Sequence, residues 1–305
     1  MPTARSPLMD VAPLPALDDR EGGAVAADLP PVIDAHVHLF PDLAWDPIHR
    51  WFDRNAWPIR YRLRSPEIVA FLLERGVEHV VALQYAHRPG LARDMNRELA
   101  ALCRTNPRVT GLATVFPGEP DTVAILEDAF ADGLAGIKLH LHVIGMAIDH
   151  PGVLQALAVA AAADRPAVVH AGREPNSPAY PRDTHAICSV DRAETALRAI
   201  PRLHLCVPHL GGDEFDEYAD LLVRCDRVWL DTTMMLAGYF PYPERWDLLE
   251  SFPHRVMYGT DFPNIPYAWD RELIRIAGRG LDRGALAAIV GGNARRFFGI
   301  SDPVG

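Results

Sequence analysis

Short runs of strand-forming residues recur eight times along this chain, and a helical pattern follows each of them. The runs occupy residues 32–38, 78–83, 109–115, 135–140, 167–170, 203–209, 228–232 and 256–261. The helical patterns occupy residues 65–75, 91–105, 121–131, 153–163, 192–199, 214–224 and 244–251, with three more at 270–277, 283–290 and 293–298. Strands that alternate with helices form parallel sheets. Eight such units predict an α/β protein folded as a (β/α)8 barrel of the TIM type.

The main alternative is an open, doubly wound sheet. That fold carries a G-x-G-x-x-G turn after its first strand, and no such turn follows residues 32–38. Since α/β barrels of this length form one domain, we expect residues 31–300 to be a single barrel. Residues 1–30 are rich in Pro, Ala and Gly and lack the apolar core of a signal peptide. We expect them to form a flexible, loosely packed leader.

The composition excludes several classes of partner. With a net charge of −10, the chain is a poor candidate for binding nucleic acid or anionic membranes. No apolar run reaches the roughly 18 residues of a membrane span. The four cysteines form no C-x-x-C pair, which indicates free thiols in a reducing compartment. We therefore expect a cytoplasmic monomer or homodimer whose partner is a small molecule.

One insertion interrupts the alternation between the first strand and the first helix. Residues 43–64 contain Trp45, Trp51 and Trp57, half of the six tryptophans, and several arginines. Two interpretations are open. The segment is either a packed loop that covers the barrel or a lid that supplies aromatic and cationic groups to an anionic substrate.

The 13 histidines are not scattered evenly. Side chains alternate along a strand, so His36 and His38 are expected to share one face of the first strand and to point into the barrel. Ile33, Ala35 and Val37 are expected to face the covering helices. Two imidazoles on one face can share a metal ion, although an H-x-H pair alone is weak evidence.

Other polar residues come at the ends of later strands. The alternation of the fourth strand continues past its strand-forming run to residue 142. By this alternation over residues 136–142, the side chains of Lys138, His140 and His142 are expected to face the interior or upper rim of the barrel. His170, His209 and Asp261 end the fifth, sixth and eighth predicted strands. Active sites of barrel enzymes lie at the carboxyl ends of the strands. The joint placement predicts a metal site at that face.

In these motifs the sequence resembles the amidohydrolase superfamily, and in particular the amidohydrolase-related branch that contains aminocarboxymuconate semialdehyde decarboxylase. The resemblance spans residues 32–299. It is carried by Asp34-Ala-His36-Val-His38, Gly136-Ile-Lys138-Leu-His140, Val-His170-Ala-Gly, Pro-His209-Leu-Gly-Gly, Tyr-Gly-Thr-Asp261-Phe-Pro and Gly-Gly-Asn293-Ala-Arg-Arg-Phe. The combination and order of these motifs are specific, whereas each motif alone is not.

The resemblance implies a role for each matched residue. His36, His38, His170 and Asp261 would bind a divalent metal, most commonly Zn²⁺, with one ion favoured. His209 would be a general acid or base or a ligand of a second ion, and Asp261 would also accept a proton from water.

The remaining expectations concern the substrate. A carboxylated Lys138 would bridge two ions, as in binuclear members, whereas a free Lys138 would hold a substrate carboxylate. His140, Arg173 and His185 are further candidates for substrate binding, and Arg173 is otherwise expected to form a surface ion pair with Glu174. By the alternation along the first strand, Asp34 shares the face of His36 and His38 one layer lower, and we expect it to support the site from the barrel interior and not to bind metal.

Three functions fit these residues. The first is a metal-dependent hydrolase that attacks a C–N, ester or lactone bond of a small, carboxylate-bearing substrate. The second is a metal-dependent, non-oxidative decarboxylase of an aromatic or unsaturated acid, which would use the same residues. The third is a catalytically silent barrel, which the loss of a ligand residue would favour, and no ligand residue is missing.

Overall fold

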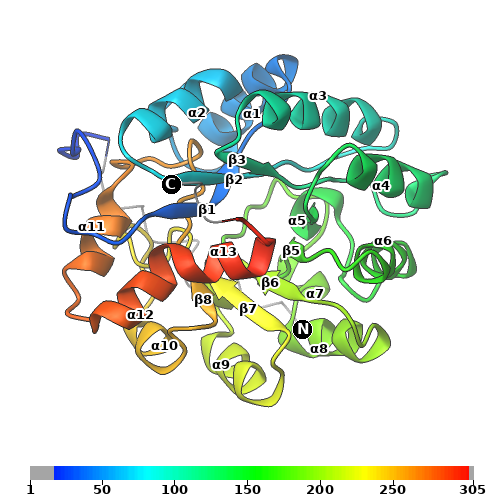
Figure 1. Ribbon diagram of the computed structural model, residues 1–305. Helices are drawn as coiled ribbons and strands as arrows, with labels where there is room; N and C mark the ends of the chain where they lie inside the picture. Colours follow the sequence, from blue (N-terminus) through cyan, green and yellow to red (C-terminus); the bar gives the residue numbers. More distant parts are fainter. Residues whose placement is uncertain (1–16, 302–305) are drawn as a thin grey trace.

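The computed structural model describes residues 17–301, and it shows a ring of parallel strands surrounded by helices (Figure 1). The strands are β1 (Ile33–His38), β2 (His79–Leu83), β3 (Val109–Gly111), β4 (Ile137–His140), β5 (Ala167–His170), β6 (Leu205–Val207), β7 (Val228–Asp231) and β8 (Val256–Met257). Each strand pairs in parallel with the next one along the chain from β1 to β3 and from β4 to β8. This sequential order is that of a βα-repeat barrel.

Two isolated bridges join the sheet of β1 to β3 to the sheet of β4 to β8 and so close the barrel. Ala113 pairs with Ile137 beside β3 and β4, and Val37 pairs with Phe262 beside β8 and β1. The amide of Lys138 donates to the carbonyl of Ala113 at 2.8 Å, and the amide of His38 donates to the carbonyl of Phe262 at the same distance. The predicted (β/α)8 barrel is confirmed.

Helices pack around the outside of the ring. They are α1 (Asp42–Asn55), α2 (Ser65–Glu74), α3 (Ala92–Thr105), α4 (Thr122–Ala131), α5 (Leu141–Ile144), α6 (Pro151–Ala162), α7 (Thr184–Ile187), α8 (Val190–Ala199), α9 (Phe215–Arg224), α10 (Trp246–Ser251), α11 (Arg271–Ala277), α12 (Arg283–Ala287) and α13 (Asn293–Phe298), with short helical turns η2 (His209–Gly211) and η3 (Ala288–Gly292). Helix α2 shows why they begin where they do, since Pro66 occupies its first turn and the Glu67 carboxylate accepts the amide of Arg64 at 2.7 Å.

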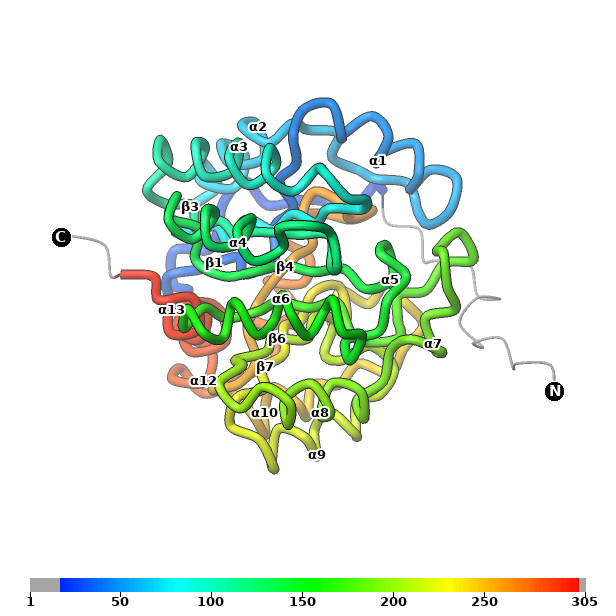
Figure 2. Tube along the Cα trace, turned by 90° about the vertical axis from the view of Figure 1, so that its right-hand side faces the viewer, coloured from blue at the N-terminus to red at the C-terminus, as the bar shows by residue number. Residues whose placement is uncertain are grey.

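The two ends of the barrel differ. Helix α13 lies at one end, where it contacts β1 and β8, while α1, α5 and α7 lie at the other (Figure 2). Buried residues of seven strands or their ends form an apolar cluster with Phe297 and Phe298 of α13. Because it joins strands from around the ring to the helix at its amino-terminal end, this cluster is the lower filling of the barrel. The polar strand ends therefore meet at the opposite, carboxyl-terminal face.

Three details differ from the sequence-based expectations. Residues 43–64 are not a loop throughout, because α1 occupies most of the segment and buries Trp45 and His49. The fourth strand ends at His140, and His142 belongs to the short helix α5. Ile33 and Ala35 pack in the interior cluster and do not face the helices, whereas Val37 packs in the outer core as expected.

An irregularity in β1 causes the third difference. Asp34 pairs with Val80 and Val37 pairs with Ala82, so β1 has one extra residue over this interval. An extra residue reverses which side chains face inward beyond it. The irregularity allows Ile33 and Ala35 to fill the lower barrel while His38 still points toward the upper site.

The described part of the expected leader packs against the barrel. The Asp19 carboxylate pairs with Arg271 at 2.8 Å, the amide of Gly22 donates to Asp270 at 2.7 Å, and the amide of Val25 donates to the carbonyl of Arg75 at 2.7 Å. These contacts do not fit a flexible leader over residues 17–30. The rest of the expected leader, residues 1–16, lies outside the described residues. Within residues 17–301, no helix is both long and apolar enough to cross a membrane.

Asn293 fastens α13 to the end of the barrel. Its fully buried side-chain amide donates to the carbonyls of Pro253 at 2.8 Å and Val256 at 2.6 Å. We expect Asn293→Ala to lower the free energy of unfolding by about 1–3 kcal/mol, because two buried carbonyls lose their donor. Urea denaturation followed by circular dichroism measures the change. An unaltered midpoint would show that these bonds contribute nothing to stability.

Candidate metal centre and active site

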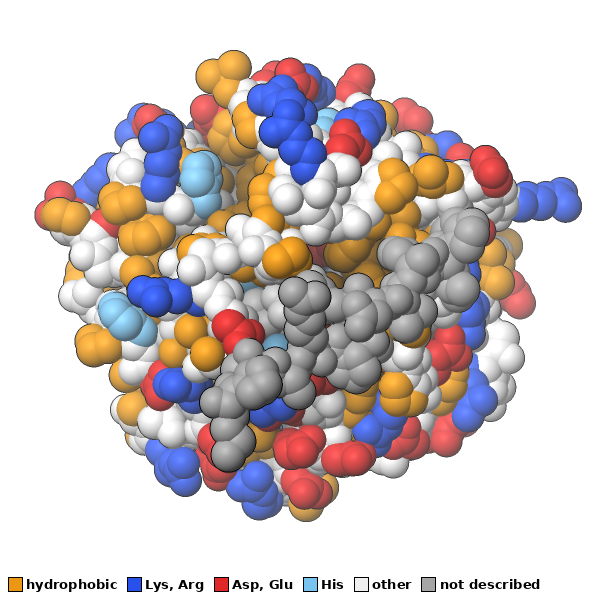
Figure 3. All heavy atoms as spheres, turned by 180° about the vertical axis from the view of Figure 1, so that it is seen from behind, with side chains coloured by type: hydrophobic (Ala, Val, Ile, Leu, Met, Phe, Trp, Pro, Cys, Tyr) orange, Lys and Arg blue, Asp and Glu red, His pale blue; other side chains and the backbone are white. Residues whose placement is uncertain are grey.

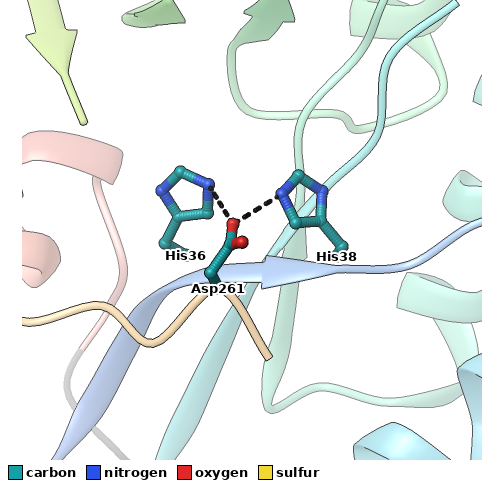
Figure 4. Close-up of side chains that lie close together, drawn as sticks. All are labelled: His36, His38 and Asp261. Carbon is teal, nitrogen blue, oxygen red and sulfur yellow. Dashed lines mark hydrogen bonds and ion pairs between the residues drawn. The ribbon is translucent and has the colours of Figure 1, made fainter. Parts of the chain in front are cut away.

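Three buried side chains meet at the carboxyl-terminal face of the barrel: His36, His38 and Asp261 (Figure 4). The Nε2 atom of His38 lies 3.0 Å from Oδ1 of Asp261, and the Nε2 atom of His36 lies 3.4 Å from the same oxygen. One ligand atom from each residue lies within 4.8 Å of the other two. Asp261 lies more than 220 positions after the two histidines in the sequence. The fold nevertheless directs its oxygen and the two histidine nitrogens toward a common point.

The backbone around Asp261 holds it in this position. Asp261 has a φ of 69°, a left-handed conformation that costs a non-glycine residue roughly 1–2 kcal/mol. Its amide donates to the carbonyl of His36 at 2.9 Å, and its carbonyl accepts the amide of Asn264 at 2.8 Å. Such strain concentrates at functional sites, where the surrounding structure enforces it.

Gly259 provides the space that His36 needs. A Cβ atom at position 259 would lie 2.7 Å from the Cβ atom of His36 and 2.8 Å from the hydroxyl of Thr233, which is closer than packed atoms allow. The glycine therefore lets the end of β8 approach β1 directly. Asp34 supports the same junction, since its carboxylate accepts the Thr260 hydroxyl at 2.6 Å and the amides of His36 and Thr260 at 3.1 Å. Burial raises the pKa of Asp34 to about 7, against the opposing effect of these bonds.

Asp231, at the end of β7, orients two histidines and was missed by the sequence analysis. Its Oδ2 atom lies 2.8 Å from Nδ1 of His36, and its Oδ1 atom accepts the backbone amide of His209 at 3.1 Å. The first contact favours a proton on Nδ1 of His36 and leaves Nε2 with a free lone pair toward Asp261. The available signal was a carboxylate at the end of the seventh predicted strand, the position that the other site residues share.

We expect Asp231→Asn to weaken metal binding by about 10- to 100-fold, because an amide no longer holds His36 in the tautomer that a ligand requires. Titration of the metal-free protein with Zn²⁺ measures the dissociation constant. The matched control is Asp220→Asn on the exposed face of α9, which should bind metal like the unaltered protein. Equal affinity in both variants would show that Asp231 does not position His36.

The residues present fit a divalent metal. Two imidazole nitrogens and a carboxylate oxygen are ligands that Zn²⁺ and neighbouring divalent ions accept. Burial is the largest influence on His36, and together with Lys138 it lowers the pKa of the imidazole well below its usual value, which leaves the ring neutral. Burial raises the pKa of Asp261, but His38, His36 and His209 outweigh it and keep the pKa below its ordinary value. The neutral ring of His36 and the ionised carboxylate of Asp261 are in the protonation states that ligation needs.

Lys138 contacts this cluster and is fully buried. Its Nζ atom is 3.3 Å from Nε2 of His36, and it is not among the residues that line the pocket above. Burial lowers the pKa of Lys138 to about 8, against the opposing influence of Asp231 and Asp261. The side chain points into the barrel, as the alternation along the fourth strand predicted, and it contacts the candidate ligand His36.

His170 and His209 lie beside the three-residue cluster. Their ring centroids are 4.5 Å apart, and that of His209 is 5.9 Å from that of His36. Nδ1 of His209 contacts the carbonyl of Thr233 at 2.9 Å, which requires a proton on Nδ1 and leaves Nε2 as the acceptor. His170 is not part of the cluster whose ligand atoms lie within 4.8 Å, yet its buried Nε2 has no hydrogen-bond partner among residues 17–301.

The histidines of the fourth strand region support His170. His140 stacks on it with ring centroids 4.2 Å apart and planes 13° apart. His142 lies at the same centroid distance and bonds through Nε2 to the carbonyl of Gly172 at 2.8 Å. Three of the histidines singled out in the sequence therefore pack as one group next to the candidate metal centre.

A pocket of about 450 Å³, measured with its open mouth, leads to the cluster. His38, His140, His170, His209 and Asp261 form part of its lining. Figure 3 views the molecule from the side opposite to Figure 1, and hydrophobic side chains are visible near the middle of this face. Access to the cluster is therefore from the carboxyl-terminal face, where barrel enzymes bind their substrates.

Two of the predicted substrate-binding residues lie elsewhere. Arg173 pairs with Glu214 at 2.7 Å and does not line the pocket. The structure thus shows the surface ion pair considered for Arg173, with Glu214 as its partner in place of Glu174. His185 also lies outside the pocket lining and contacts the Glu174 carboxylate at 3.2 Å. Local ion pairing accounts for both side chains, and of the four predicted substrate-binding residues only His140 reaches the pocket.

Comparisons with solved structures agree with the barrel. A 5-carboxyvanillate decarboxylase from Sphingomonas paucimobilis is 16% identical, with a TM-score of 0.59, covering 88% of this chain and 99% of its own. A probable 2-pyrone-4,6-dicarboxylic acid hydrolase from Acinetobacter baumannii is 16% identical, with a TM-score of 0.60 and the same coverage. A 5-carboxyvanillate decarboxylase from Novosphingobium aromaticivorans, solved with manganese, is 17% identical, with a TM-score of 0.60, covering 93% of this chain and 99% of its own.

Sequence comparison gives the family directly. A search of curated proteins found no match. The sequence profile of the amidohydrolase family, however, matches residues 33–300, which include the whole barrel and every candidate site residue described above. The chain belongs to the amidohydrolase family.

Proposed function

We propose that this protein is a metal-dependent hydrolase that cleaves a C–N, ester or lactone bond of a small molecule. The observation that carries the proposal is the convergence of His36 Nε2, His38 Nε2 and Asp261 Oδ1 next to a pocket that His38 and Asp261 line. His36, His38 and Asp261 would hold the ion, with His170 as the candidate fourth ligand. We propose Zn²⁺, one ion per chain. A divalent ion supplies Lewis acidity there, which lowers the pKa of water and polarises a carbonyl.

The protein's own groups would move the protons. Asp261 is buried and ionised, so its carboxylate can accept a proton from an attacking water at neutral pH. His209 lines the same pocket with Nε2 free, because Nδ1 is fixed on the carbonyl of Thr233. The Nε2 atom of His209 can take up the second proton of the attacking water and deliver it to the leaving group, while the proton held by Asp261 passes to solvent. Burial lowers the pKa of His209, which favours the neutral ring as the resting form.

A second candidate, non-oxidative decarboxylation, has one observation in its favour. Among the described residues that line the pocket, Asp261 is the only carboxylate, and no lysine or arginine accompanies it. A substrate carboxylate away from the ion would lose its hydration without gaining a cationic side chain, which favours loss of CO2. Two of the solved structures compared above are decarboxylases, which adds to this candidate.

One experiment separates the two reactions. The zinc-loaded protein is incubated with amides, esters and lactones in one series and with aromatic and unsaturated carboxylic acids in another. Acid release in the first series supports the hydrolase, and release of CO2 in the second supports the decarboxylase. Dialysis against a chelator should remove either activity, and Zn²⁺ should restore it. Absence of turnover in both series with metal bound would contradict the proposed function.

A further inference from the structure

Aromatic side chains from separate segments form one wall of the pocket. We name as the aromatic wall the pocket-lining residues Trp51, Phe52, Trp57, Tyr85 and Tyr180. Trp51 and Tyr180 stack with ring centroids 5.2 Å apart and planes 29° apart. Phe52 contacts Trp51 at 5.3 Å and Trp57 at 5.4 Å between centroids, in edge-to-face geometry. The wall is therefore continuous from the loop after β5, through α1, to the segment that follows α1.

Polar contacts hold this wall in place. The hydroxyl of Ser177 donates to the carbonyl of Asn55 at 2.9 Å and joins the loop after β5 to the end of α1. The indole N–H of Trp57 donates to the carbonyl of Asn264 at 2.7 Å. Because these bonds fix backbone segments on both sides, the rings are arranged before a ligand arrives. A preorganised aromatic surface loses little entropy on binding a flat ligand.

The wall reaches the candidate metal centre at Tyr85, which is linked to Tyr180 through His140, whose ring centroid lies 6.2 Å from that of Tyr180. The ring of Tyr85 lies edge-on to His38 at 5.5 Å and to His140 at 4.8 Å between centroids. A ring that packs on the wall can therefore place a substituent toward His38 and Asp261. Aromatic pairs contribute about 0.5–1.5 kcal/mol beyond the apolar area they bury.

Asn264 supplies a polar group in the same pocket. Its side chain is almost fully buried, and its Oδ1 atom has no hydrogen-bond partner among residues 17–301. A buried acceptor without a donor is costly, so a ligand N–H or O–H would be favoured there. The described lining offers no cationic side chain to a second carboxylate.

We propose that the pocket selects a substrate with an aromatic ring, a hydrogen-bond donor for Asn264 and no negative charge besides any on its reacting group. This inference rests on the proposed function for the reaction and on the pocket lining for the substrate class. It differs from the carboxylate-bearing substrate expected from the sequence, because neither Lys138, which is fully buried, nor Arg173 is among the residues that line the pocket. The insertion that carries Trp51 acts as an aromatic wall, and its arginines do not line the pocket.

Binding of matched amides to the zinc-loaded protein tests the inference. The three probes are benzamide, cyclohexanecarboxamide, which lacks the aromatic ring, and terephthalamate, which adds a carboxylate. We expect calorimetry to show benzamide binding about 3- to 10-fold more tightly than the saturated amide, as the aromatic contact predicts. Terephthalamate is also titrated into the metal-free protein, where no ion can bind its carboxylate, and there it should bind at least about 10-fold more weakly than benzamide, because the carboxylate is desolvated without a cationic partner.

Trp51→Ala should remove most of the preference for benzamide over the saturated amide. Trp246→Ala is the control, since Trp246 lies on α10 and not in the pocket. It should keep the preference, and circular dichroism checks that both variants are folded. The inference is overturned if terephthalamate binds the metal-free protein as tightly as benzamide does, or if Trp51→Ala retains the full preference. If the protein prefers aromatic amides but turns over no amide, ester or lactone, the proposed hydrolase is contradicted and the inference about the pocket stands. If it turns over such a substrate but shows no aromatic preference, the inference is contradicted and the proposed hydrolase stands.

Discussion

Asp261→Ala is expected to lose its metal and to reduce turnover by at least about 10³-fold, the largest effect we predict for a single substitution. The change removes an oxygen on which His36 and His38 both converge, at 3.4 and 3.0 Å. It also removes the carboxylate that we propose accepts a proton from water, and such a group alone contributes about 10²–10⁴-fold. Metal content by inductively coupled plasma mass spectrometry and steady-state rates measure the two losses.

The fold should survive this substitution. Asp261 follows β8 and belongs to neither apolar cluster, and its backbone bonds to His36 and Asn264 do not need its side chain. Asp220→Ala, on the exposed face of α9, is the control and should keep metal and activity. Full metal occupancy in folded Asp261→Ala would contradict the assignment of Asp261 as a ligand.

His209→Asn is expected to lower kcat by about 10²–10⁴-fold while the protein keeps one metal ion. Asparagine can still donate to the carbonyl of Thr233, which His209 contacts at 2.9 Å, but it cannot carry a proton at the position of Nε2. The loss should therefore fall on kcat more than on KM. Rates over a range of pH should also lose one titration that the unaltered enzyme shows.

The matched control is His204→Asn, because His204 is exposed and lies before β6. It should behave like the unaltered protein. If His209→Asn loses its metal together with its activity, His209 is a ligand and the assigned proton transfer is wrong. If its kcat is unchanged, His209 has no part in the reaction.

The barrel could be predicted because local patterns determine it. Each βα unit carries its own apolar periodicity, and parallel strands joined by helices leave few other arrangements. The rule that active sites lie at the carboxyl ends of strands then brought His36, His38 and Asp261 to one face before any contact was known. The structure places these three side chains together.

Details that depend on contacts between distant segments could not be predicted from the sequence. The register shift in β1 arises from its pairing with β2, so strict alternation placed Ile33 and Ala35 on the wrong side. Arg173 could be read as a substrate clamp because its partner Glu214 lies 41 residues away in the sequence. The position of Asp231 at the end of the seventh predicted strand could have marked it as a site residue, but its contacts with His36 and His209 join segments far apart in the sequence.

The most direct test is a crystal structure of the zinc-loaded protein with anomalous diffraction measured at the zinc edge. The account predicts one anomalous peak per chain, at about 2.0–2.2 Å from His36 Nε2, His38 Nε2 and an Asp261 oxygen. A peak bound by other residues, or no peak in protein that retains the fold, would contradict the central claim that these three side chains hold a catalytic metal ion.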